Sequence, residues 1–593
     1  MNSSVEFRRN VYHYGNSFDK DIVFVSKNIS FADENVKSIC VANWDTNDDG
    51  ELSCDEAAAV TSADEFKAAF GSTKTYTSFD EFKYFTGLTS IPNSMFDGWR
   101  LTSIKLPESI EGIAAYAFKG CNGLTSITIP ERVTYLNTSV FQDCSSLTSM
   151  IIPERVTFIG SSAFAGCSGI TSMILSDSVT YIGSFAFQNC SSLSSITIPT
   201  CVTIIGMYAF SGCNSLTSIN IPDGVTTING GIFSGCNCLT SIEIPEGVTS
   251  IGGSAFENCS SLTSIEIPEG VTSIGGAAFE NCSSLTSINI PVGVTTIAER
   301  AFMGCSNLTL INIPVGVTTI GNNAFRNCSS LTSIVIPDSV FNIGGSAFEN
   351  CSSLTSIDIP EGATSIGGGA FRNCSSLTSI DLPEGITSID GYAFENCSNL
   401  TSIEIPEGVT SIGGGAFASC SGLTSIDIPD GVTVIGGAAF RNCSRLTSII
   451  IPDGVTTIDI GTFRDCKRLT SISLPDGITT IGEYAFCDCI NLTTIDIPEG
   501  VTTIGDNAFR ACSELTSISI PVGVVTIGSR AFMSCSSLTS ITVFATTVPI
   551  CGDYTFSYSS NCPIYVPAES VDAYKTAEGW SEYADRITAI GTL

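Results

Sequence analysis

The chain has 593 residues, with 58 Asp and Glu against 25 Lys and Arg, and a formal net charge of −33. Phosphate recognition needs clustered Lys and Arg, so this balance argues against binding to nucleic acid or to anionic lipid. The single histidine, His13, leaves little room for histidine-based catalysis. No apolar run approaches the ~18 residues that a membrane-spanning helix needs. No apolar segment follows Arg8 and Arg9, so the sequence as it stands predicts no secretory signal.

A loop pattern typical of calcium sites follows an N-terminal tail, 1–32, inside a small module predicted over 33–77. Residues 45–56 read D-T-N-D-D-G-E-L-S-C-D-E, which matches D-x-[DN]-x-[DN]-G-x₅-E at every constrained position. Calcium takes six to eight oxygen ligands. Gly50 permits the sharp bend, and Leu52 is expected to anchor the loop. The predicted donors are Asp45, Asn47 and Asp49 through side chains, Glu51 through its carbonyl, Ser53 through water, and Glu56 through two oxygens.

This loop resembles the calcium loops of EF-hand and dockerin proteins, and the resemblance implies one bound Ca²⁺. Helices are expected on both sides, over Glu34–Trp44 and Glu56–Phe70. Dockerins and most EF-hands use paired loops, and no second loop is visible here, so a structural clamp is expected rather than a sensor. The alternative interpretation is an acidic surface turn without a metal.

After an irregular first coil over 78–100, the chain repeats every 23 residues. Twenty units start between Leu101 and Leu538, and together they span 101–560. The unit reads L-T-S-I-x-I-P-E-G-V-T-S-I-G-x-x-A-F-x-x-C-S-S. Fixed-period self-similarity of this length indicates a stack in which each unit packs on its neighbours. The expected fold is therefore one elongated solenoid.

Each repeat should hold two short strands and a short helical or 3₁₀ turn. In the unit 262–284, alternation places Ile265 and Ile267 on one face of the first strand and Glu266 on the other. Pro268 starts a turn, 271–274 form a second β-prone stretch, and 277–282 suit the helical turn. The predicted inward set is Leu262, Ile265, Ile267, Val271, Ile274, Ala278, Phe279 and Cys282.

Two repeat positions are almost constant. Phenylalanine recurs in nineteen units from Phe118 to Phe532, and cysteine recurs in nineteen units from Cys121 to Cys535. We expect a buried Phe column and reduced, buried thiols that act as small hydrophobes. Metal binding or disulfides between coils are the alternatives for these cysteines. Outside this register, Cys551 and Cys562 flank a predicted loop, and a disulfide between them stays open.

The repeat resembles the BspA-like branch of the leucine-rich repeat proteins over about residues 78–593. The resemblance implies a right-handed, leucine-rich-repeat-like solenoid, rich in β-structure. It also implies a surface or secreted protein tied to adhesion, with a host matrix protein or another cell as the partner. The last segment, 561–593, is similar to the terminal segment of that family. It predicts a strand at Ile564–Pro567 and an amphipathic helix from Ser570 to Ile587 that caps the last coil, with Trp580 and Tyr583 packed on it.

The outward position of the first strand is variable, and we interpret it as the binding face. Its polar members from the sixth unit onward are Asn220, Glu243, Glu266, Asn289, Asn312, Asp358, Asp381, Glu404 and Asp427, with Val335 among them. The turn position adds a parallel acidic row: Glu246, Glu269, Glu361, Glu384, Glu407, Asp430 and Asp453. Such rows attract cations. The alternatives are a surface that serves solubility after recent duplication, and carbohydrate binding, which lacks aromatic platforms in this row.

On another face Glu349, Arg372 and Glu395 alternate in sign and should form exposed ion pairs worth about 0–1 kcal/mol each. These features favour a non-enzymatic, adhesin-like binding protein, monomeric and secreted or displayed at the cell surface, that presents its repeats to a host or microbial protein. The missing export signal and the many thiols favour the alternative, an intracellular interaction scaffold. An enzyme is disfavoured because no acid, base or nucleophile constellation stands apart from the repeats.

Overall fold

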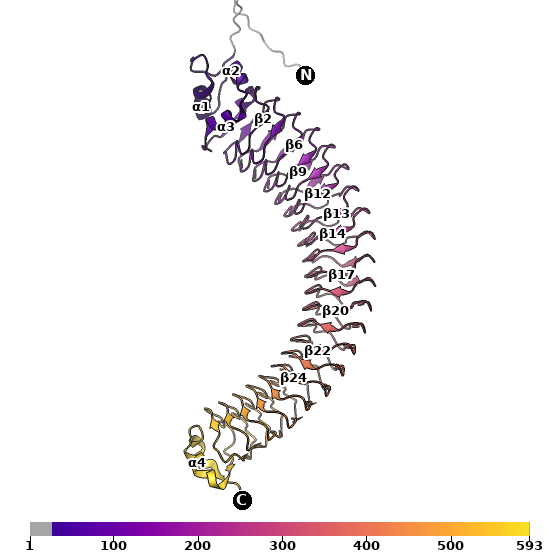
Figure 1. Cartoon of the computed structure of the whole chain (residues 1–593), viewed down its shortest axis with the longest axis vertical. Coiled ribbons are helices and arrows are strands. Elements are labelled where there is room, and N and C mark those ends of the chain that lie inside the picture. The colour runs from indigo at the N-terminus through magenta and orange to yellow at the C-terminus, as the bar shows by residue number, and fades with distance from the viewer. Residues whose placement is uncertain (1–26, 592–593) are drawn as a thin grey trace, which may run out of the picture.

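The computed structural model describes residues 27–591 and shows a long, curved stack of coils (Figure 1). Three helices, α1 (Glu34–Trp44), α2 (Cys54–Ala59) and α3 (Ala63–Phe70), lie at one end, and α4 (Val571–Thr576) lies at the other. The predicted solenoid, with a helical N-terminal module and a strand-helix C-terminal cap, is confirmed. Within 27–591 no helix has the length and apolar character needed to cross a bilayer. Residues 1–26 of the predicted tail, with His13, lie outside the described residues.

The V-T-S-I segment, which is the second strand of each repeat, forms a two-residue strand that pairs in parallel with its neighbours 23 residues away. We call this row of strands the second-strand column. Ile251, for example, is the register partner of Ile228 on one side and Ile274 on the other. Up to β15 these strands are β2 (Ser90–Ile91), β4 (Gly112–Ile113), β6 (Tyr135–Leu136), β8 (Phe158–Ile159), β10 (Tyr181–Ile182), β12 (Ile204–Ile205), β13 (Thr227–Ile228), β14 (Ser250–Ile251) and β15 (Ser273–Ile274). Then follow β17 (Thr296–Ile297), β19 (Thr319–Ile320), β20 (Asn342–Ile343), β21 (Ser365–Ile366), β22 (Ser388–Ile389), β23 (Ser411–Ile412), β24 (Val434–Ile435), β26 (Thr457–Ile458), β28 (Thr480–Ile481), β29 (Thr503–Ile504), β31 (Thr526–Ile527) and β33 (Ile550–Cys551).

The T-S-I-x-I segment, which is the first strand of each repeat, forms an interrupted column of parallel strands. We call it the first-strand column. Its members are β1 (Ser78–Phe79), β3 (Ser103–Ile104), β5 (Ser126–Thr128), β7 (Ser149–Ile151), β9 (Ser172–Ile174), β11 (Ser195–Thr197), β16 (Ser287–Asn289), β18 (Leu310–Asn312), β25 (Ser448–Ile450), β27 (Ser471–Ser473), β30 (Ser517–Ile520), β32 (Ser540–Val543), β34 (Ile564–Val566) and β35 (Ile587–Ala589). In this column several intervening coils are joined by isolated bridges instead of strands, such as Asp358 to Asp381 and Glu404 to Asp427.

The stretch predicted as a short helix is a series of turns. Hydrogen bonds of the 3₁₀ type are present, from Ala278 N–H to the Gly275 carbonyl and from Cys282 N–H to the Phe279 carbonyl. The backbone does not become helical, because Ala277 and Asn281 adopt φ values of 57° and 59°. Their N–H groups, and that of Phe279, instead donate to carbonyls of the next coil. Backbone hydrogen bonds therefore tie neighbouring coils together on this side as well.

The core is a column of phenylalanine rings that runs along the solenoid. Consecutive rings from Phe118 to Phe532 are stacked, with centroids between 5.2 Å (Phe509 and Phe532) and 5.9 Å (Phe210 and Phe233) apart. Every ring of this column is fully buried, and burial of one such side chain stabilises the fold by about 1.5–3 kcal/mol. The whole inward set predicted for the unit 262–284 is buried too. The prediction of the core is confirmed.

The nineteen repeat cysteines form a second buried column beside the rings. Each thiol donates to the carbonyl of the phenylalanine in the preceding coil, as Cys282 does to Phe256 at 3.2 Å. All nineteen are buried and free of disulfides. Burial raises the pKa of thiols such as Cys305 to about 12, so they stay protonated and unreactive. Cys551 and Cys562 are also buried and free, without a disulfide between them.

The N-terminal module differs from its prediction in one respect. Helix α1 has the predicted bounds, but the single helix expected over Glu56–Phe70 is divided into α2 and α3. Val60 is extended, with ψ of 113°, and Ser62 accepts a hydrogen bond from Glu65 N–H as the N-cap of α3. A β-branched pair at Val60 and Thr61 followed by a strong capping residue favours this restart. The apolar face of α3 then packs Phe66 and Phe70 on the first coil, where Phe70 meets Trp99.

The C-terminal cap also departs from the single helix predicted between Ser570 and Ile587. Helix α4 ends at Thr576, and Gly579 follows with φ of 75°. The chain then adds β35 to the sheet beside β34. The Ser570 hydroxyl bonds the Thr546 carbonyl rather than capping α4. Trp580 and Tyr583 pack on Phe556 of the last coil as predicted, and Trp580 is fully buried. Both open ends of the core are thus covered, as a repeat stack requires.

Candidate functional site

The predicted calcium loop connects α1 to α2, and Gly50 lies at a bend in it. Gly50 has φ of 82° and donates its N–H to Asp45 Oδ2 at 2.8 Å. Asp49 N–H donates to Asn47 Oδ1, and Glu51 N–H donates to Asp49 Oδ1. Leu52 is fully buried, and its carbonyl accepts from Ile29 N–H at 2.8 Å. The loop is therefore closed onto the preceding segment of its own chain.

Glu56, the predicted closing ligand, has a capping role in this conformation. Its carboxylate accepts from the N–H and hydroxyl of Ser53 and from the N–H and hydroxyl of Thr46, all at 2.9 Å. The backbone N–H of Ser53, followed by the groups of Thr46, lowers the pKa of Glu56 to about 2. Ser53 accepts in return from Glu56 N–H as the N-cap of α2. These two residues form a capping box.

The other predicted donors point to different partners. Asp45 Oδ1 is buried without a hydrogen-bond partner, whereas the Glu51 carboxylate pairs with Lys37 Nζ at 2.7 Å. Between residues 27 and 591 no three or more His, Cys, Asp or Glu side chains come close enough to hold a metal ion. The oxygen donors of the loop suit calcium, but Glu56, Asp49 and Asp45 Oδ2 here accept hydrogen bonds from the loop's own N–H and hydroxyl groups.

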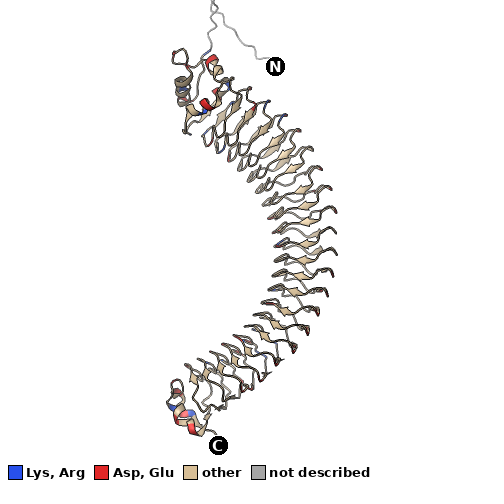
Figure 2. Cartoon of the chain, viewed as in Figure 1, with Lys and Arg blue, Asp and Glu red and all other residues tan. Residues whose placement is uncertain are grey.

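The predicted binding face is an exposed row on the first-strand side of the solenoid, and its members lie on adjacent coils. Asn220 bridges to Glu243, Asp358 to Asp381, and Glu404 to Asp427. Figure 2 shows acidic residues recurring from coil to coil along the arc. Like charges directly opposite each other in neighbouring strands are destabilising. The two acid–acid bridges therefore have a cost that a cation on this face would relieve.

The two acidic rows border shallow grooves between successive coils. One groove of about 450 Å³ is lined by Glu404, Glu407, Asp427 and Asp430 together with Pro406. A second, of about 370 Å³, is lined by Glu243, Glu246, Glu266 and Glu269 with Pro268. In both grooves the strand row supplies one pair of carboxylates and the turn row supplies the other. A cationic side chain placed there would meet carboxylates from two coils.

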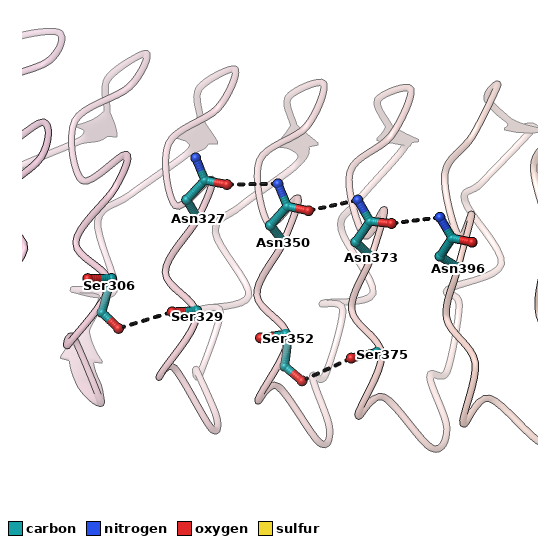
Figure 3. Close-up of a pocket in the computed structure, with 8 residues that line it drawn as sticks. All are labelled: Ser306, Asn327, Ser329, Asn350, Ser352, Asn373, Ser375 and Asn396. Carbon is teal, nitrogen blue, oxygen red and sulfur yellow. Dashed lines mark hydrogen bonds between the residues drawn. The ribbon is translucent and has the colours of Figure 1, made fainter.

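A different groove, of about 560 Å³, lies over a ladder of asparagines that sequence analysis had not singled out (Figure 3). Each amide donates to the side-chain oxygen of the preceding coil, with 2.7 Å from Asn350 to Asn327, from Asn373 to Asn350 and from Asn396 to Asn373. Asn350 has φ of 62°, a left-handed conformation that asparagine tolerates. Because the amides satisfy one another, the ladder has a structural explanation.

The predicted exposed ion pairs are partly buried, which corrects that expectation. Glu349 pairs with Arg326 and Glu395 with Arg372, and the two Glu side chains are only 8% and 12% exposed. The partner side chains Arg326 and Arg372 are 37% and 42% exposed. Arg372 also lies 5.6 Å from the centre of the Tyr392 ring. These ion pairs join neighbouring coils.

The sequence reasoning missed a row of apolar residues on the second-strand column, of which two are exposed and two are half-buried. Tyr135, Phe158, Tyr181 and Ile204 are register partners on β6, β8, β10 and β12. We call this set the aromatic strip. Tyr135 and Ile204 are 55% and 50% exposed. All four occupy the twelfth position of the repeat, where most units have Ser or Thr, so aligning the units at that position would have revealed the row.

Comparison with known proteins gives consistent results. The family model described as "BspA type Leucine rich repeat region (6 copies)" matches residues 89–217, 138–260, 203–332, 318–447 and 433–563. A leucine-rich repeat protein from Bacteroides ovatus is 33% identical over 59% of this chain and 92% of its own, with a TM-score of 0.54. A leucine-rich cell surface protein from Faecalibacterium prausnitzii is 30% identical over 57% of this chain and 82% of its own, with a TM-score of 0.33. No curated protein matched.

Proposed function

Because the chain belongs to the BspA-type leucine-rich repeat family, we propose that it is a non-enzymatic, adhesin-like protein, exported to the cell surface, that binds a cationic region of a partner protein. The repeat fold presents a protein-binding surface. The observation that carries the proposal is the acidic pair of rows. Residues such as Glu404 and Asp427 are exposed on adjacent coils at a position where the core imposes no residue type. The proposed partner is a host matrix protein or a protein of another cell.

Binding of the full chain to immobilised fibronectin, laminin and collagen tests the partner class. Neutralising four carboxylates with Asp358→Asn, Asp381→Asn, Glu404→Gln and Asp427→Asn should weaken binding to the recognised protein at least tenfold at low ionic strength. The wild-type interaction should also weaken with added salt, because exposed charges are screened beyond about 8 Å at physiological ionic strength. A matched control neutralises Glu299, Asp390, Glu483 and Glu514, which are exposed and lie outside both acidic rows. Equal loss in both variants would contradict a specific face.

Location is tested separately on intact cells of the source organism. Export predicts that antibody labels the protein without permeabilisation and that external protease removes it while a cytosolic marker survives. The alternative function, an intracellular scaffold, is favoured by 26 cysteines that are all free in this fold, since thiols persist in reducing compartments. Protection of the protein from external protease would support that alternative.

We also propose that residues 45–56 bind one calcium ion that stabilises the N-terminal module. The support is the buried, unpartnered Asp45 Oδ1 and the left-handed Gly50 in a loop whose donors are all oxygen. Asp45, Asn47, Asp49, Glu51, Ser53 and Glu56 would hold the ion. Binding requires that the Glu56 carboxylate exchanges its bonds to Thr46 for the metal. The expected consequence is a module that resists unfolding better as free calcium rises.

Calorimetric titration with calcium chloride should give one site in the wild type. Asp45→Asn keeps an acceptor for Gly50 N–H but removes the ligand charge, so it should weaken binding at least tenfold. The matched control is Asp48→Asn, which removes an equal charge from an exposed loop residue that is not a predicted ligand. Asn also tolerates the φ of 58° found there. Equal affinity in the two variants, or no calcium uptake by the wild type, would leave the acidic-turn interpretation standing.

A further inference from the structure

The aromatic strip differs from the rest of the outer surface in chemistry. Its coils, residues 101–216, contain six acidic and four basic residues, whereas residues 217–430 contain 20 acidic and three basic residues. Ile151 and Ile174 are also 81% and 74% exposed, on the first-strand column of the same coils. Apolar side chains that gather on the surface of an otherwise polar monomer commonly mark an interaction site.

The way the rings stand decides what they can contact. Phe158 and Tyr181 are parallel to within 3°, with centroids 4.7 Å apart. Two coplanar rings cannot approach so closely without overlap, so these rings must stack face to face and stand upright on the sheet. Tyr135 meets Phe158 at 66°. The strip therefore presents ring edges to solvent, and Phe158 and Tyr181 cover each other's facing sides.

This orientation disfavours a glycan. A sugar ring packs on an open aromatic face, and Phe158 and Tyr181 take one face from each other by stacking. Ring edges carry the positive part of the aromatic quadrupole, so they attract ring faces and negatively charged groups. Arg132 and Arg155 stand three residues before Tyr135 and Phe158. Arg132 pairs with Glu111, whereas Arg155 has no ion pair within the described part of the chain. Arg155 is therefore the cation that this strip offers to an acidic group of a partner.

The size of the strip limits the partner. Three strand spacings of about 4.8 Å separate Tyr135 from Ile204, so the strip is about 14 Å long. Its four side chains expose at most a few hundred Å², whereas a stable dimer needs about 800 Å² from each subunit. A slender partner fits this area and a second copy of the chain does not. An extended segment at about 3.3 Å per residue covers the strip with four or five residues.

We propose that the aromatic strip binds an extended polypeptide segment that carries aromatic and acidic side chains. This surface lies on a different strand column from the acidic rows and takes a partner of opposite charge, so it goes beyond the proposed function. Aromatic side chains of the segment pack their faces on the exposed ring edges, and its carboxylates lie toward Arg155. The two surfaces give one chain two binding specificities along its length.

Fluorescence anisotropy with synthetic ten-residue peptides tests the proposal on the full chain. One peptide alternates tyrosine with serine and contains two aspartates, a second has lysines in place of the aspartates, and a third has serine in place of every tyrosine. The variant combines Tyr135→Thr, Phe158→Thr and Tyr181→Thr. Threonine occupies the same position in β13, β17 and β19, so the fold should tolerate it. The control is Val434→Thr, at the equivalent exposed position of β24.

The tyrosine–aspartate peptide should bind the wild type and the control alike, and at least tenfold more weakly to the triple variant. The lysine peptide should bind at least threefold more weakly than the aspartate peptide, and the serine peptide should not bind. Equal binding by wild type and triple variant, or no binding of the aromatic peptides, overturns the proposal. So does binding of cellohexaose or chitohexaose that the triple variant loses, or a dimer in sedimentation equilibrium that it dissociates. Loss of acidic-row binding alone leaves this proposal intact.

Discussion

The N-terminal coils, 101–216, and the central coils, 217–430, have the same interior but different exteriors. Phe141 and Phe279 occupy the same position in the ring column and are equally buried. Outside the core, six aromatic residues are at least partly exposed on the N-terminal coils, against two, Phe341 and Tyr392, on the central coils. The central coils instead carry a large excess of acid. The core fixes only the inward positions, so the outward positions of a solenoid can diverge without altering the fold.

The strongest test of the shared interior is alkaline pH. The pKa of Cys190 in the N-terminal coils and of Cys305 in the central coils is raised by burial to about 12, above the ~8.5 of an unfolded thiol. The unfolded chain therefore loses protons first, so stability is complete below about pH 8.5 and falls as pH rises toward 12. Each thiol should contribute a slope of about 1.4 kcal/mol per pH unit, which accumulates over the coils that unfold together.

Urea unfolding at pH 8 and pH 10.5 measures this slope. Lysines and tyrosines also titrate in this range, so the control is Cys190→Ala or Cys305→Ala. Each substitution should reduce the pH dependence of the unfolding free energy by the contribution of one thiol. The reduction should be the same in the two regions. A pH dependence unchanged by either substitution would show that the thiols are not its source.

Removal of one ring from the core should have the next largest effect. Phe141→Ala and Phe279→Ala should each cost about 3–5 kcal/mol, because a stacked ring leaves a cavity that its two neighbours cannot fill. Hydrogen exchange should show the loss confined to the mutated coil and those beside it. A cost that differs by more than about 1 kcal/mol between the two sites would mean that the interiors are not equivalent.

Neutralisation of the acidic row should affect the central coils alone. Asp381→Asn removes the like-charge bridge to Asp358, and Asp427→Asn removes the bridge to Glu404. Each change should stabilise the chain by about 0.2–1 kcal/mol at low ionic strength. Thermal unfolding in 10 mM and 1 M sodium chloride measures it, since the gain should vanish in high salt. A gain that persists in 1 M salt would point to a cause other than charge repulsion.

An effect of similar size is expected for the asparagine ladder, which the N-terminal coils largely replace with glycine, as at Gly166 and Gly212. Asn350→Gly keeps the left-handed backbone but removes the bonds to Asn327 and Asn373. The expected cost is about 0.5–1 kcal/mol. Asn350→Ala should cost more, because alanine also strains at φ of 62°. Equal costs for the two variants would mean that backbone conformation contributes little here.

Much of this protein could be predicted from its sequence because the repeat multiplies a weak local signal. The period identifies the solenoid, and the alternation in one unit identifies the inward set from Leu262 to Cys282. Helix α1 was predicted with its observed bounds, since Asp33 is a strong N-cap and caps it. The single helices expected after Glu56 and after Ser570 were wrong. Their residues are helix-compatible, but Ser62 starts a new helix as an N-cap, and Gly579 adopts a left-handed conformation that prevents α4 from continuing.

The sequence by itself determined the period, the ring column and the thiol column, because burial restricts these positions to one or two residue types. Tertiary structure alone decided which outward residues meet. Tyr135, Phe158 and Tyr181 stand 23 residues apart in the chain and become a stacked strip only through strand register. The same register joins Asn350 to Asn327 and Asp358 to Asp381. Contacts across coils depend on how side chains of neighbouring coils, one strand spacing apart, are oriented. This orientation cannot be deduced from a single repeat.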